Sequence, residues 1–138
     1  MLTGVMPFVL LIALLAGRAD QPIRTSVCAV IANPRAYDRK VVTVRADVLT
    51  DWHHGSILVD PSCKGGFNYW DDAAPRHEAR ALDHAIGTLL DGGGDRTASA
   101  TFTGRVTWHP RKRSFFQSPF ELRLTRIENV TERLKERR

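Results

Sequence analysis

The chain has 138 residues, of which 43% are hydrophobic and 25% are charged, and its formal net charge is +5 at pH 7. This length is that of one globular domain and is enough for a single core. The charge excess is compatible with an anionic partner but does not predict one, because charges of both signs are spread along the chain.

Residues 1–19 have the pattern of a secretory signal peptide. An apolar run over residues 5–16 is followed by Gly17 and Ala19, two small residues just before an expected cut at Asp20. The run is shorter than the about 20 residues that a permanent membrane-spanning helix needs. No Lys or Arg precedes it, so an uncleaved membrane anchor is the alternative. We therefore expect a cleaved signal and a periplasmic or secreted protein without cytosolic partners.

The rest of the chain is expected to form one domain over residues 20–130. Residues 131–138 are strongly charged and predict a solvated tail or a frayed helical end. No second apolar run is long enough to span a membrane.

Two cysteines, Cys28 and Cys63, occur in the chain. In an oxidising compartment an isolated pair most simply forms one disulfide, and closing a loop of this span stabilises the fold by about 4 kcal/mol in the chain-entropy model. Two buried free thiols are the alternative. A catalytic redox pair would usually have the spacing CxxC, which is absent.

The first predicted elements are a short helix and a turn. Ser26 is a suitable N-cap for a helix over residues 27–32. Pro34 ends this helix, because the residue before a proline is disfavoured in the helical region. Residues 35–40 are expected to form a turn.

Three extended segments follow. Residues 41–50 alternate between apolar and polar side chains and predict a half-buried strand. Residues 56–60 predict a second strand that forms a hairpin with the first. Residues 64–70 are rich in glycine and aromatic residues and predict a short third strand. The inward face of the first strand is expected to consist of Val42, Val44, Ala46 and Val48.

A helix is expected over residues 75–90, because apolar residues recur there at helical spacing. Its buried stripe is expected to consist of Ala79, Leu82, Ile86 and Leu89.

Two further strands are predicted in the second half of the chain. Residues 97–108 alternate, and Gly104 falls on the inward face, where a strand bends or another backbone comes close. Residues 115–127 predict the last strand. The inward residues of these two strands are expected to be Ala98, Ala100, Phe102, Val106, Trp108, Phe120, Leu122 and Leu124.

This order of elements predicts a mainly β fold. Five strands, a short N-terminal helix and a helix between strands three and four match the five-stranded, OB-like Greek-key barrel. The segment CAVIANPRAYDRKVVTVRADV, with Pro34, Tyr37 and Lys40, resembles the opening of exported bacterial OB-fold proteins, and the segment FELRLTRIENV resembles their closing strand. The resemblance implies the same barrel but no particular activity.

Two loops of such a barrel are the candidate binding site, because OB-folds bind ligands through the loops that join strands one and two and strands four and five. We expect both loops at one barrel mouth, where rings offer stacking surfaces and basic groups attract an anionic polymer or a glycan. Alternatively, the aromatic residues close the barrel ends and the basic residues form a soluble loop tip. Export argues against nucleic acid as the physiological ligand. The predicted site consists of Trp52, His53, His54, Trp108, His109, Arg111, Lys112 and Arg113.

A metal site is a further alternative, formed by His53, His54 and His109 if the two loops meet. Adjacent histidines in an extended segment point to opposite sides, and His77 and His84 are too far apart on their helix for an HExxH-type pair. We therefore expect histidines that are exposed or packed, and no metal or cofactor.

No motif in the sequence indicates catalysis: neither GxSxG nor HExxH occurs. We therefore expect a non-catalytic binding or interaction module whose partner the sequence does not identify. The alternative is a structural or envelope-stress accessory protein with no small ligand.

Overall fold

The computed structural model describes residues 21–51, 55–91, 96–111 and 118–134. The expected signal peptide, residues 1–19, lies outside the described residues. In chain order the elements are β1 (Ile23–Arg24), α1 (Val27–Ala32), α2 (Pro34–Tyr37), β2 (Val41–Asp51), β3 (Gly55–Val59), β4 (Gly66–Trp70), α3 (Arg76–Asp91), β5 (Arg96–Trp108) and β6 (Phe120–Leu134).

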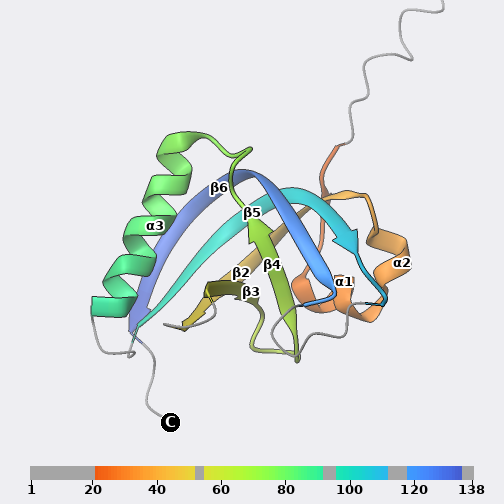
Figure 1. The fold of residues 1–138 in the computed structure, drawn as a ribbon, viewed down its shortest axis with the longest axis horizontal. Helices are drawn as coiled ribbons and strands as arrows, with labels where there is room; N and C mark the ends of the chain where they lie inside the picture. The colour runs from red at the N-terminus through yellow and green to blue at the C-terminus, as the bar shows by residue number, and fades with distance from the viewer. Residues whose placement is uncertain (1–20, 52–54, 92–95, 112–117, 135–138) are drawn as a thin grey trace, which may run out of the picture.

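Within the described residues, five strands close into one barrel (Figure 1). β2 pairs antiparallel with β3, and β3 pairs antiparallel with β4. β4 lies parallel to β6, β6 is antiparallel to β5, and β5 returns antiparallel to β2 and closes the barrel. The two-residue strand β1 lies parallel to the start of β2. The predicted mainly β barrel is therefore confirmed.

The alternation predicted for β2 and β5 is confirmed by their burial. The predicted inward residues of β2 are almost fully buried, and so are those of β5 except Trp108, which is half-buried against the core. Polar residues on the outer face pair across the two strands: the Thr43 and Thr103 hydroxyls lie 2.9 Å apart, and Ser99 donates a hydrogen bond of 2.5 Å to Asp47. Each strand therefore has one apolar face and one polar face, as a barrel wall requires.

The core continues into α1 at one end of the barrel. Ser26 accepts a hydrogen bond from the Ala29 N–H, which confirms the predicted N-cap, and Val27 and Val30 are fully buried. A disulfide between Cys28 and Cys63 joins α1 to the connection between β3 and β4, as predicted. This bond is compatible with an oxidising compartment.

The turn predicted over residues 35–40 is partly helical. α2 covers Pro34–Tyr37, and its first residue is a proline, which fits the start of a helix because its missing N–H has no partner there in any case. After α2, the chain is fixed against β5: the Arg39 N–H donates to the Val106 carbonyl and the Val106 N–H donates to the Lys40 carbonyl. These two hydrogen bonds fix the start of β2 beside the end of β5.

α3 is confirmed and packs on β5 and β6 (Figure 1). In its predicted stripe Leu82 is fully buried, whereas Ala79 and Ile86 are half-buried; Ala85 is buried as well. The side chain of Leu89 lies outside the described residues. No helix in the described part of the chain is long and apolar enough to cross a bilayer.

β6 is shifted relative to the predicted strand. The predicted residues 115–117 lie outside the described residues, and β6 begins at Phe120. It continues to Leu134, so residues 131–134 form a strand and not a helical end, although Thr131 and Glu132 are exposed to solvent as expected of a charged tail. The reason is long-range pairing: Ser99 pairs with Thr131 and Arg96 pairs with Leu134, which extends the ladder along the whole length of β5.

Candidate functional site

The two loops of the predicted site leave the barrel at opposite ends of the β2–β5 ladder (Figure 1). Because the strands are antiparallel, Val48 pairs with Ala98, whereas Val41 pairs with Arg105. The β2–β3 connection therefore follows the Ala98 end, and the β5–β6 connection follows the Arg105 end. The expectation that both loops belong to one barrel mouth is wrong. Trp52, His53, His54, Lys112 and Arg113 lie outside the described residues.

The described residues of the second loop, by contrast, gather around one hollow. Trp108, His109 and Arg111, together with Pro110, line a space of about 390 Å³. The Trp108 N–H donates to the Asp38 carboxylate at 2.9 Å, and the His109 N–H donates to the Pro119 carbonyl at 2.7 Å. Trp108 also packs against the core, so it helps to close the barrel end while it contributes to the hollow.

A second hollow lies on the outer surface of the barrel, across β4, β6 and β5. Its volume is about 250 Å³, and we call it the Trp70 cleft. The strand register builds it: Trp70 pairs with Arg123, and Thr107 pairs with Glu121. The Trp70 side chain is 61% exposed, the most exposed of the large hydrophobic residues in the described part of the chain. The cleft is lined by Trp70, Asp72, Thr107, Glu121 and Arg123.

Sequence reasoning missed this cleft, although part of its signal was present. The predicted third strand contains Phe67, which is fully buried, and strand alternation then places Trp70 on the opposite, outer face. The alternation of the sequence therefore allowed one to predict that the tryptophan at the end of this strand faces outward. The other walls come from strands that pair only in the folded barrel.

One ion pair joins two of the charged side chains that line the cleft. Arg123 Nη2 lies 2.7 Å from Asp72 Oδ2, and both side chains are more than half exposed. A pair so exposed contributes at most about 1 kcal/mol to stability, so its main effect is to position the two groups.

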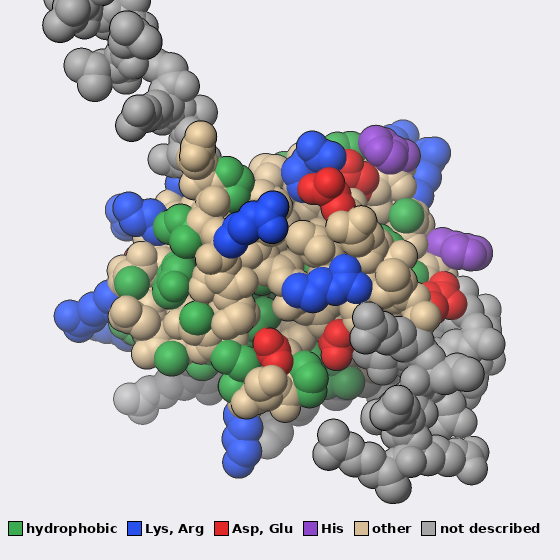
Figure 2. All heavy atoms as spheres, turned by 180° about the vertical axis from the view of Figure 1, so that it is seen from behind, with side chains coloured by type: hydrophobic (Ala, Val, Ile, Leu, Met, Phe, Trp, Pro, Cys, Tyr) green, Lys and Arg blue, Asp and Glu red, His purple; other side chains and the backbone are tan. Residues whose placement is uncertain are grey.

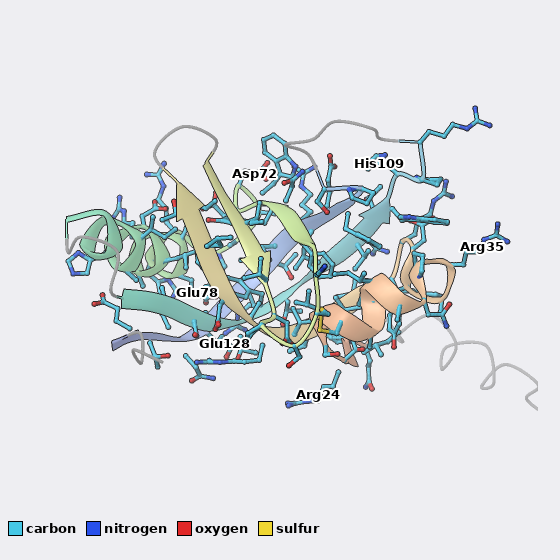
Figure 3. All side chains as sticks on the ribbon, turned by 90° about the horizontal axis from the view of Figure 1, so that it is seen from below. Arg24, Arg35, Asp72, Glu78, His109 and Glu128 are labelled. Atoms are coloured by element: carbon cyan, nitrogen blue, oxygen red, sulfur yellow. A yellow bond between two sulfur atoms is a disulfide. The ribbon has the colours of Figure 1, made fainter. Side chains whose placement is uncertain are left out.

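His109 connects the two hollows. Its Nε2 atom lies 3.4 Å from Glu121 Oε2, so a residue of the first hollow contacts a wall of the Trp70 cleft. The same Nε2 atom is shielded from solvent and makes no hydrogen bond within the described residues. In Figure 3, Asp72 and His109 lie on the same side of the barrel, away from Arg24 and Glu128.

The described residues do not assemble a metal site. No three side chains among the His, Cys, Asp and Glu residues of the described part of the chain are grouped so that they could hold an ion. His77 is exposed on α3. The β2–β3 connection, which carries His53 and His54, begins at the other end of the β2–β5 ladder from His109.

Charge is mixed on the face of the molecule turned away from the view in Figure 1. Figure 2 shows Lys and Arg side chains there at separate positions, with Asp and Glu and uncharged surface between them. Among the described residues on this face, the basic side chains therefore do not form one continuous patch.

Comparison with known proteins gives no relative: no family model matches the chain, and neither a curated protein nor a solved structure shows a significant match.

Proposed function

We propose that this protein is an exported, non-catalytic glycan-binding module built on an OB-like Greek-key barrel. The strand order supports the Greek-key part of this proposal. β2, β3 and β4 are consecutive antiparallel neighbours, and β5 returns through α3 to lie beside β2. This is the spatial order that defines a Greek key, and OB-folds are barrels of this kind that bind oligosaccharides and oligonucleotides.

Export is supported by two independent features. Residues 1–19 have the pattern of a signal peptide, and the Cys28–Cys63 disulfide fits an oxidising compartment. An exported module meets glycans rather than cytosolic nucleic acid.

The observation that carries the glycan proposal is the exposed indole of Trp70 in a cleft with polar walls. Ligand sites combine apolar or aromatic surface with a few placed polar groups. A sugar ring presents an apolar C–H face that fits a flat indole, and hydroxyl groups at its edge that fit carboxylates and guanidinium groups. The Trp70 cleft supplies both kinds of partner.

A polyanion is a poorer fit to this cleft than a glycan. Asp72 and Glu121 would repel it, and Arg123 is already paired with Asp72 at 2.7 Å. Of the two ligand classes that the sequence indicates, anionic polymer and glycan, the cleft therefore favours the glycan. The adjoining hollow at Trp108, His109 and Arg111 extends the surface that a longer chain of sugars could cover.

The test is binding of soluble oligosaccharides, measured by calorimetry. We expect Trp70→Ala to weaken binding by roughly tenfold or more, as truncation of a central aromatic anchor does. Leu49→Ala is the matched control, because Leu49 is 58% exposed but lies on β2, outside the cleft. If Trp70→Ala binds as tightly as the wild type, the proposal is wrong.

A protein-binding accessory role without a small ligand is the second candidate. It is favoured by Leu49, which is exposed on the outer face of β2 and pairs directly with Ile57 of β3. Capture of an envelope protein by the wild type but not by Leu49→Asp, with no oligosaccharide bound, would favour this role.

A further inference from the structure

We infer that the protein binds linear oligosaccharides of about three or more sugar units in preference to single sugars, and that the hollow at Trp108, His109 and Arg111 is the second half of the binding site. This inference rests on the proposed function, because it names the ligand class of the same site. It follows from the way in which β5 and β6 join the two hollows.

The two hollows share a border. Thr107 lines the Trp70 cleft, and the next residue, Trp108, is the last residue of β5 and lines the other hollow. From the loop after β5, His109 Nε2 lies 3.4 Å from Glu121 Oε2 on the wall of the cleft. A ligand that lies over Trp70 therefore reaches the second hollow by crossing β6 and passing the end of β5.

Neither hollow alone is large. Their volumes are about 250 Å³ and 390 Å³. Pockets for small molecules usually have volumes of about 300–1,000 Å³, so each hollow is at or near the lower end of this range. An extended ligand that occupies both hollows buries more of its surface than a compact ligand in either one.

The strand register sets the length of a ligand that spans both hollows. Trp70 pairs with Arg123 of β6, and Arg123 pairs with Arg105 of β5, three residues before Trp108. Strands about 4.8 Å apart with a rise of about 3.4 Å per residue place the Cα atoms of Trp70 and Trp108 roughly 14 Å apart along the sheet. A sugar unit of a linear chain is about as long as one inter-strand spacing, so about three units connect the two tryptophans.

The second hollow offers the same combination of groups as the cleft, on a fixed backbone. Trp108 contributes a half-buried indole, and His109 and Arg111 contribute polar groups that suit sugar hydroxyls. The Trp108 N–H donates to the Asp38 carboxylate at 2.9 Å, and the His109 N–H donates to the Pro119 carbonyl at 2.7 Å. Because this backbone is already held in place, little of it has to be ordered when a ligand binds.

The experiment measures the affinity of the full chain for sugars of increasing length at neutral pH. The probes are linear oligomers of glucose, of N-acetylglucosamine and of mannose, from one unit to five, titrated by calorimetry, with NMR titration for the single sugars. For the family that binds, we expect the affinity to rise by about tenfold or more from one unit to three, because a second contact within the same ligand adds to the first. The affinity should change little for longer chains.

Two variants test the second hollow. Arg111→Ala removes an exposed side chain, and Trp108→Leu removes the indole but keeps an apolar side chain against the core. Both should retain the wild-type affinity for a single sugar and lose most of the gain with length. Arg24→Ala is the matched control and should keep the whole gain, because Arg24 is an exposed arginine on β1 that lines neither hollow (Figure 3).

Thermal midpoints show whether each variant is folded, and Arg111→Ala decides the test if Trp108→Leu does not fold. Binding that depends on Trp70 but does not strengthen with length, or a gain with length that both folded variants keep, overturns the inference and leaves the proposed function intact. Failure of the folded wild type to bind any of the oligomers overturns both.

Discussion

At Gly104, the missing side chain allows two strands of the barrel to approach closely. A Cβ atom built at this position would come within 2.8 Å of the Arg123 carbonyl carbon and 3.0 Å of Leu124 Cα. Both are backbone atoms of β6, so neither can move aside as a flexible side chain can. The neighbouring register shift between Thr103 and Gly104 lies at the same crossing.

Gly104→Ala is therefore expected to destabilise the protein by about 1–3 kcal/mol, the usual cost of overpacking. Gly87→Ala is the matched control, because a Cβ at Gly87 meets no atom within 4 Å and alanine favours the helix. Urea unfolding of both variants measures the difference. Equal stability of the two variants would contradict the close approach of β5 and β6.

Tyr69 has a perturbed titration. Burial raises the pKa of its hydroxyl above the ordinary value of 10.0; a hydrogen bond with Ser56 lowers it, and the charges of Asp71 and Asp83 raise it further. Below pH 10 the hydroxyl keeps its proton in both the folded and the unfolded protein, so it has no effect on the pH dependence of stability there. Above pH 10 the unfolded chain loses this proton first, and the free energy of unfolding falls as the pH rises.

Tyr69→Phe should therefore reduce the loss of stability above about pH 10, relative to the wild type. The measurement is the free energy of unfolding from urea titrations at a series of alkaline pH values. The same slope in both proteins would mean that the Tyr69 hydroxyl is solvated in the folded state.

At the scale of elements, Glu78 connects α3 to β6. This glutamate is buried, and its Oε1 accepts a hydrogen bond of 2.7 Å from the Ile127 N–H and one of 3.4 Å from Arg126 Nε. The main-chain contact fixes where the helix crosses the strand, and the guanidinium compensates the buried charge.

Glu78→Ala should cost about 1–3 kcal/mol, because it leaves the buried Ile127 N–H without an acceptor. Glu78→Gln retains an acceptor oxygen and should cost less. Urea unfolding followed by circular dichroism measures both, with Glu128→Ala as the control for loss of an exposed glutamate from β6. A Glu78→Ala protein as stable as this control would show that packing alone holds α3 in place.

At the scale of the whole molecule, the disulfide is a covalent link between two segments that are distant in the sequence. Cys28 and Cys63 are separated by 35 residues, and their bond ties α1 to the connection between β3 and β4. Without it, the denatured chain gains conformational freedom, and only non-covalent contacts hold α1 on the barrel.

Replacement of both cysteines by serine should lower the free energy of unfolding by about 4 kcal/mol on the chain-entropy model. Reduction of the wild type should have a similar effect, and alkylation before reduction should label no thiol. Labelling of two thiols in the purified protein would contradict the bond.

Local patterns predicted much of this fold. β2, β5 and α3 each bury one face, so their residues alternate or recur at a period that identifies the element. The disulfide followed from the count of cysteines and the expected compartment. Pairings between distant segments were not predictable in this way: residues 131–134 look like a charged tail, yet they become a strand because β5 offers them a partner.

The candidate site depends even more on such pairings. Trp108, His109 and Arg111 were predicted from their place in the loop after the fourth strand of an OB-like barrel, and they do line one hollow. The relation between the two predicted loops depends on the antiparallel β2–β5 ladder, and the sequence alone does not define it. The Trp70 cleft combines residues from β4, β5 and β6 with Asp72, which becomes a wall only when β4 and β6 lie side by side.

The central claim is that a glycan binds on the outer surface formed by β4, β6 and β5. The most direct measurement is an NMR titration of the isotope-labelled full chain with a soluble oligosaccharide, in which the indole N–H signals of the three tryptophans are assigned from single Trp→Phe variants. The account predicts that the Trp70 signal moves most, followed by the Trp108 signal and by amides around Glu121 and Arg123. Shifts confined to Trp52 and the β2–β3 connection, or spectra that do not change at all, would contradict it.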